Sequence, residues 1–212
     1  SLSLSKPQLL GTLGGAGSDA EGITDHGKIV GSAQLKNGHY HPVIWTIRDG
    51  SIQDLGTLGD GGGAGFAISQ NGFVAGVSGT VAHPDEPFWR SPSGLMIDLL
   101  PHHIYVGGTA AAASAAQNVA GWVNTANNTY PAFWRAFSSV KQLPTLGGAN
   151  GIATGINVKN QVVGYSDTGS ATHAFLWTYT GGVTDLGTLG GTNSKAFAIS
   201  REGRVVGSSE LP

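Results

Sequence analysis

A short motif recurs along the chain at nearly constant spacing, and this recurrence constrains the fold more than any other feature. Its copies begin 45, 44, 44 and 43 residues apart, at Leu10, Leu55, Leu99, Leu143 and Leu186. Four copies read Leu-Gly-Thr-Leu-Gly-Gly or a close variant, and the third is reduced to Leu-Leu-Pro. Such a period indicates similar units that bury their apolar faces against one another.

Two further markers recur in the same phase. An apolar pair followed by glycine comes about twenty residues after each start, ending at Gly31, Gly76, Gly121, Gly164 and Gly207. A tryptophan follows in four units, as Trp45, Trp89, Trp134 and Trp177. Because an indole buries roughly 150–250 Å², we expect these four side chains to be buried between successive units.

The composition favours short strands joined by tight turns. Glycine accounts for 35 of 212 residues, hydrophobic residues for 40% and charged residues for only 11%. Glycine supplies the positive φ that hairpin turns need, and the apolar share is enough for a core. The fourth unit illustrates the expected four strands, at residues 153–157, 161–166, 173–179 and 183–189. The alanine run at residues 110–116 is in phase with the first strand of its unit, so we expect a strand there.

Four antiparallel strands in about 44 residues match one blade of a β-propeller. We therefore predict an all-β fold, a five-bladed β-propeller that forms one domain over residues 1–212. The repeats span about 10–54, 55–98, 99–142, 143–185 and 186–212 plus 1–9. The last unit has two strands only, and we expect the N-terminal strands, at residues 1–5 and 9–13, to complete it. A β-solenoid is the alternative fold.

The fourth and fifth units resemble a known repeat family. The resemblance rests on Thr-His-Ala-Phe-Leu-Trp at residues 172–177, Thr-Asp-Leu-Gly-Thr-Leu-Gly-Gly at residues 184–191, Ala-Ile-Ser at residues 198–200 and Val-Val-Gly at residues 205–207. These segments are similar to the HAF repeat of bacterial proteins, named for its His-Ala-Phe signature. The resemblance extends over nearly the whole chain and is weak in the third unit. It implies a secreted or surface protein and brings no catalytic motif.

Charge and composition exclude several kinds of partner. A formal net charge of -2 and a pI near 6.3 give no electrostatic basis for binding nucleic acid. No apolar stretch approaches the roughly 18 residues of a membrane span. The absence of cysteine excludes disulfides and thiolate metal sites. The chain begins at Ser1 and shows no signal peptide, so we expect a processed or trimmed chain.

Histidines point to one face of the predicted disc. In each blade the second-to-third-strand loops and the links to the next blade lie at one end, and six of the seven histidines fall in or beside them. The third unit also departs from the repeat, with a Pro-His-His turn at residues 101–103 and a tryptophan where the other units have a smaller side chain or tyrosine. The residues that we expect to bind a ligand at this face are His102, His103, Tyr105, Trp122, Tyr130, His41 and His173.

Three classes of function remain open from the sequence. We favour an extracellular recognition module that binds carbohydrate, because an added tryptophan can stack on a sugar ring. A polysaccharide lyase would use His102 or His103 with Tyr105 or Tyr130 and Arg135 or Arg90, whereas a glycosidase would need two carboxylates. A structural spacer is the third class. We expect neither a cofactor nor a metal site. The spacing of His39 and His41 is only a weak signal for a metal.

Overall fold

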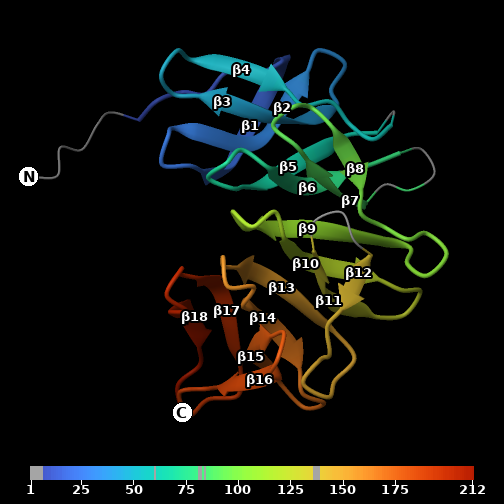
Figure 1. Ribbon diagram of the computed structural model, residues 1–212, viewed down its shortest axis with the longest axis vertical. Coiled ribbons are helices and arrows are strands. Elements are labelled where there is room, and N and C mark those ends of the chain that lie inside the picture. Colours follow the sequence, from blue (N-terminus) through green and yellow to red (C-terminus); the bar gives the residue numbers. More distant parts are fainter. Residues whose placement is uncertain (1–6, 60, 81–82, 84, 136–138) are drawn as a thin grey trace, which may run out of the picture.

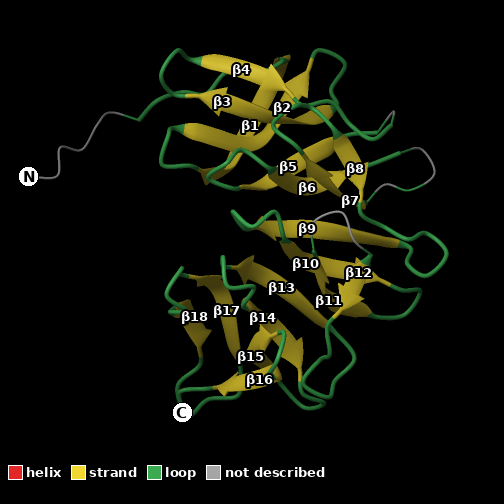
Figure 2. Cartoon of the chain, in the orientation of Figure 1, coloured by secondary structure: helices red, strands yellow, loops and turns green. Residues whose placement is uncertain are grey.

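The computed structural model describes residues 7–59, 61–80, 83, 85–135 and 139–212. Within these residues the chain forms 18 β-strands and no helix, as Figure 2 shows. The alanine run is confirmed as a strand, because β9 (Gly107–Ala113) contains it up to the turn that begins at Ser114. No described helix is long and apolar enough to cross a membrane.

The strands form five antiparallel sheets, which we call blades 1 to 5 (Figure 1). Blade 1 consists of β1 (Gly14–Ile23), β2 (Lys28–Leu35), β3 (Tyr40–Thr46) and β4 (Ser51–Asp54). Blade 2 consists of β5 (Gly63–Ile68), β6 (Val74–Ser78), β7 (Glu86–Arg90) and β8 (Met96–Asp98). Blade 3 consists of β9, β10 (Val119–Asn124), β11 (Thr129–Trp134) and β12 (Val140–Gln142). Blade 4 consists of β13 (Gly151–Ile156), β14 (Val162–Asp167), β15 (Thr172–Thr178) and β16 (Gly182–Gly187), and blade 5 of β17 (Ser194–Ile199) and β18 (Val205–Ser209).

Within each complete blade the strands pair in sequence order, and we call them A to D. The A strands of successive blades lie near one another, so the blades converge along their A strands. Antiparallel order places the A–B and C–D turns at one end of every blade. The B–C loops and the D–A links lie at the other end, which we call the loop face.

Successive blades are held together by apolar side chains that project from facing sheets. In strand B the residue before the repeated glycine points toward the next blade, and in the four complete blades it is fully buried: Val30, Ala75, Ala120 and Val163. These side chains belong to four separate clusters, one at each interface between blades. The sheets therefore bury one another's faces, as the repeat predicts.

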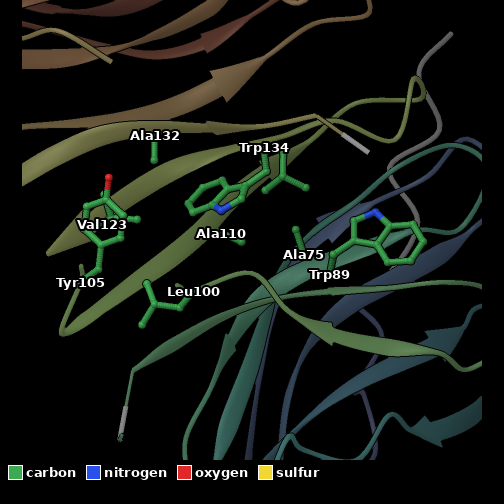
Figure 3. Close-up of a cluster of buried hydrophobic side chains, with 9 residues drawn as sticks. Ala75, Trp89, Leu100, Tyr105, Ala110, Val123, Ala132 and Trp134 are labelled. Atoms are coloured by element: carbon green, nitrogen blue, oxygen red, sulfur yellow. The ribbon is translucent and has the colours of Figure 1, made fainter. Parts of the chain in front are cut away.

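All four repeated tryptophans are buried as predicted, with at most 4% of each side chain exposed, but one is out of register. Trp45, Trp134 and Trp177 lie opposite the first residue of the Val-x-Gly marker or its equivalent. In blade 2 that position pairs with Arg90, and Trp89 lies one residue earlier. Because side chains alternate along a strand, Trp89 faces blade 3 and joins Trp134 there (Figure 3).

The length of the B–C connection and the position of the tryptophan do not match in blade 2. Paired residues at this position are 16 apart in blades 1 and 2 and 15 apart in blades 3 and 4, but Trp89 follows Val74 by only 15 residues. Arg90 therefore takes the tryptophan position and lies buried between blades 1 and 2. Burial lowers the pKa of the Arg90 guanidinium, and the charge of Asp54 opposes that change. An alignment of tryptophans alone could not detect this exchange.

The expected closure of the ring is not found in the described residues. Residues 9–13 do not pair with blade 5; Leu13 forms a bridge with Leu35, and Leu10 and Leu13 pack against Trp45 in blade 1. Blade 5 has two strands, and Val206 is 62% exposed where its counterparts in the other blades are fully buried. The two ends of the described arc lie apart in Figure 1. The expected strand at residues 1–5 lies outside the described residues.

The position of the N-terminal segment has a physical reason. The indole Nε1 of Trp45 donates a hydrogen bond to the Gly11 carbonyl oxygen at 2.9 Å, just as Trp134 donates to the Leu99 carbonyl at 3.0 Å. Leu99 directly follows strand D of the blade before Trp134. Residues 9–13 therefore occupy, beside blade 1, the place where strand D of a preceding blade ends.

The repeated glycine of strand B is a steric requirement that a substitution can test. A Cβ added to Gly121 would lie 1.9 Å from the Thr109 carbonyl oxygen of the neighbouring strand A. We expect Gly121→Ala to lower the free energy of unfolding by about 3 kcal/mol, measured by urea denaturation. Gly11→Ala is the control, since an added Cβ there meets nothing within 4 Å. Equal stability of both variants would contradict this account.

Candidate functional site

Two of the predicted ligand-binding histidines form a repeated pair with the aspartate that recurs in strand D, Asp54 or Asp185. The His41 Nδ1 lies 3.0 Å from Asp54 Oδ1, and the His173 Nδ1 lies 2.8 Å from Asp185 Oδ2. Each aspartate also accepts a hydrogen bond from a turn amide, that of Gly56 at 2.8 Å or Gly187 at 2.7 Å. His41 and His173 thus have a structural role beside the ligand-binding role that we expect, because both connect strand C to strand D.

Blade 2 departs from this pair in a specific way. Register places Glu86 where blades 1 and 4 have His41 and His173, since each lies two residues before the side chain opposite the repeated glycine. Glu86 is 3% exposed and faces Asp98, the repeated aspartate of this blade. Where blades 1 and 4 pair an imidazole with a carboxylate, blade 2 brings two carboxylates together.

Two histidines from the loop face surround these carboxylates. His102, from the link that replaces the usual glycine turn, has its Nε2 2.7 Å from Asp98 Oδ2 and 3.7 Å from Glu86 Oε1. His83, from the B–C loop, stacks on His102 with ring centroids 4.5 Å apart and planes inclined by 28°. Potential ligand atoms of His83, Glu86 and His102 all lie within 4.8 Å of one another. We call His83, Glu86, Asp98 and His102 the blade 2 cluster.

The electrostatics of the blade 2 cluster follow from burial. Burial raises the pKa of the Glu86 carboxyl, and the negative charge of Asp98 raises it further. Positive charge on His102 and His83 and a hydrogen bond from Thr80 act in the opposite direction. The cluster therefore favours any cation that can approach both carboxylates. Sequence reasoning included His102 among the ligand-binding residues but missed Glu86, because only the strand register shows that it replaces a histidine.

Other predicted residues lie apart from this cluster. Tyr105 is 6% exposed and belongs to the apolar core between blades 2 and 3 (Figure 3). Its hydroxyl donates a hydrogen bond to Gln142 Oε1 at 3.3 Å. Burial raises the pKa of the Tyr105 hydroxyl. Tyr130 is half-buried, and its Oη accepts a hydrogen bond from Asn128 Nδ2. His103 is exposed at the loop face.

Trp122 does not share a surface with the substituted turn. It follows Ala120 by two residues in β10, so it points to the side that packs against blade 4. The next residue, Val123, faces blade 2 and packs with Tyr105. Trp122 is half-buried, and its partial exposure leaves it available to a ligand only on the blade 4 side.

A polar groove is present elsewhere on the loop face, between blades 4 and 5. It has a volume of about 420 Å³ and is lined by Gly148, Ala149, Asp167, Gly169, Ser170, Ala171, Thr172 and Asn193. Asp167 accepts hydrogen bonds from Thr172 Oγ1 at 3.2 Å and Asn150 Nδ2 at 3.3 Å. The Asn193 side chain is fixed by the Thr172 amide and the Glu210 carboxylate. The groove thus presents polar groups that are already held in place.

The stack of four-stranded sheets defines a propeller-like all-β protein. Among solved structures the chain is similar to TolB from Acinetobacter baumannii, with a TM-score of 0.62 and 14% identity over 87% of this chain and 47% of that chain. It is also similar to an acylaminoacyl peptidase from Pyrococcus horikoshii, with a TM-score of 0.50 and 14% identity over 80% of this chain and 27% of that chain. The chain thus spans less than half the length of either protein, and at this identity the likeness shows the fold alone. No family model matches the chain, and no curated protein matches its sequence.

The repeated His–Asp pair predicts a pH-dependent stability. Burial tends to raise the pKa of Asp185, but the Gly187 amide and His173 outweigh it, so the pKa lies below its usual value. A depressed carboxyl pKa stabilises the fold above the unfolded pKa, and this stabilisation is lost as pH falls through the folded pKa. We expect Asp185→Asn to lower stability at pH 7 by roughly 0.5–1 kcal/mol, because the pair is partly exposed. The gap between variant and parent, followed by thermal unfolding, should narrow below about pH 4; a gap independent of pH would contradict the assignment.

Proposed function

We propose that this chain is an extracellular recognition module that binds carbohydrate through the polar groove between blades 4 and 5. The groove itself carries this proposal, because it is the part of the loop face where a carboxylate, a hydroxyl and an amide line one hollow: Asp167, Thr172 and Asn193. Sugars present hydroxyl groups that both donate and accept hydrogen bonds, and these three side chains offer the matching partners.

The charge of the groove supports a neutral ligand. Among the described residues no lysine or arginine lines it, so a phosphorylated or sulfated ligand would find no counter-charge there. Its side chains are held by hydrogen bonds before a ligand arrives, which reduces the entropic cost of binding. The extracellular location is supported by the resemblance to HAF repeats.

The residues that line the groove favour binding of a carbohydrate over its cleavage. Of the described residues that line it, Asp167 alone carries a carboxylate, whereas glycoside hydrolysis ordinarily uses two carboxyl groups about 5–9.5 Å apart. Of the groups considered for a lyase, Tyr105 and Arg90 are buried between blades and do not reach the groove. We therefore propose binding without turnover as the function.

We also propose that the complete protein closes its ring. In blades 1 to 4 a strand C covers strand B, and the equivalent edge of β18 has no partner among the described residues. The exposed Leu186, Leu189 and Val206 are the counterparts of covered residues in earlier blades. A five-bladed ring follows if residues 1–5 add a strand beside β18, with residues 9–13 continuing toward blade 1.

Binding is tested by a glycan array followed by calorimetry on the best neutral oligosaccharide. We expect Asp167→Asn and Thr172→Ala each to weaken binding about tenfold, the effect of losing one hydrogen bond to a charged group. Asp25→Asn, in an A–B turn at the opposite end of the blades, is the control and should bind like the parent. Absence of glycan binding, or a rise in ultraviolet absorbance on uronate polymers from a lyase reaction, would refute the proposal.

Ring closure is tested by hydrogen exchange of β18. If a strand covers this edge, all amides of residues 205–209 should exchange slowly, as in β14, which is paired on both sides. Deletion of residues 1–6 should then speed exchange at alternate amides of β18 and leave β14 unchanged. Fast exchange at those amides in the undeleted chain would rule out closure by this segment.

A further inference from the structure

The blade 2 cluster has a composition that the repeat does not require. A histidine at the position of Glu86 would restore the pair that holds blades 1 and 4 together. Instead the chain places two carboxylates side by side, one of them almost fully buried, and adds a histidine from each of two connections on the loop face. Burial and the negative charge of Asp98 both raise the pKa of the Glu86 carboxyl, and a cation between the two carboxylates would relieve their repulsion.

Three separate backbone segments hold the donor groups. Glu86 begins strand β7 and is fixed by the register of the sheet. The B–C loop that carries His83 is closed by reciprocal hydrogen bonds with Thr80, from the His83 amide to Oγ1 at 3.0 Å and from the Thr80 amide to the His83 carbonyl at 2.7 Å. His102 lies in a turn in which the Pro101 carbonyl accepts two backbone hydrogen bonds. The three candidate metal ligands are therefore all carried by backbone segments that hydrogen bonds hold in place.

We propose that His83, Glu86 and His102 bind one divalent transition-metal ion, with zinc as the best match, and that the negative charge of Asp98, whose Oδ2 lies 2.7 Å from His102 Nε2, adds to the attraction for the ion. Two imidazoles and one carboxylate suit zinc and its neighbours in the first transition series, whereas magnesium and calcium prefer oxygen ligands alone.

The distances require only a small adjustment of the side chains. The three ligand atoms lie within 4.8 Å of one another, and a tetrahedral zinc ion with bonds of about 2.1 Å holds its ligands roughly 3.4 Å apart. Movements of about an ångström in side chains at a loop face are sufficient. Three protein ligands leave a fourth position open on the exposed side of His102. The ion would neutralise both carboxylates and fasten the B–C loop of blade 2 to the link that leads to blade 3.

Calorimetric titration of untagged, chelator-treated protein with zinc chloride tests this site. We expect one ion per chain, and a higher melting temperature in the presence of zinc than with chelator. Cobalt should give the visible absorption bands of a low-coordinate site, while magnesium and calcium should give no heat of binding. Absence of zinc binding, or binding of magnesium or calcium at the same site, would overturn the proposal.

Matched variants assign the ligands. His83→Ala, Glu86→Gln and His102→Ala should each weaken zinc binding by more than about 100-fold, and Asp98→Asn should weaken it less, because that variant removes only a neighbouring negative charge. His103→Ala, in the same turn and exposed, should bind zinc like the parent. Glu86→Gln keeps the shape of the side chain and removes one of two neighbouring negative charges. This variant should therefore fold and report on zinc binding alone. Zinc binding that survives His83→Ala and Glu86→Gln, or that is lost equally in His103→Ala, would overturn the assignment.

Discussion

The burial of one sheet by the next is the interaction on which the rest of this structure depends. A blade of four short strands is a single sheet, so each of its two faces is exposed to solvent until a neighbouring blade covers it. The contrast between Val163 and Val206 measures this dependence, because the two residues occupy the same position in the repeat. Val163 is fully buried by blade 5, and Val206 is 62% exposed where no described strand follows. Stability in this chain is thus a property of interfaces between blades.

The repeat made most of the fold predictable, because it reports the interfaces directly. The four-stranded units, the strand at the alanine run and the burial of the tryptophans all follow from markers that recur in phase. The register of blade 2 did not follow, since Trp89 lies one residue before the position opposite Val74, and so on the opposite face of its strand, while its apparent spacing is unchanged. The structural position of a residue in the repeat is set by pairing between strands. Residue spacing along the sequence gives that position only when every loop has the same length.

The candidate sites were harder to predict for the same reason. His102 was found because it interrupts a turn, but its partner Glu86 resembles an ordinary polar residue until the register places it on the histidine position of the repeat. Tyr105 was chosen for the same interruption and is instead part of the core between blades 2 and 3. The polar groove near Asn193 depends on two blades meeting at an angle, which no local pattern in the sequence encodes.

Repeat equivalence offers a way to separate function from packing in such a protein. A departure that is compensated within the same interface, as the charge of Arg90 is by that of Asp54 between blades 1 and 2, needs no further explanation. The exchange of histidine for Glu86 is different, because it creates a repulsion that the remaining core does not relieve. The groups that do relieve it, His83 and His102, both come from the loop face. The repulsion between Glu86 and Asp98 is thus offset only by groups close to solvent. A cation that binds from solvent explains this arrangement better than the packing of the blades does.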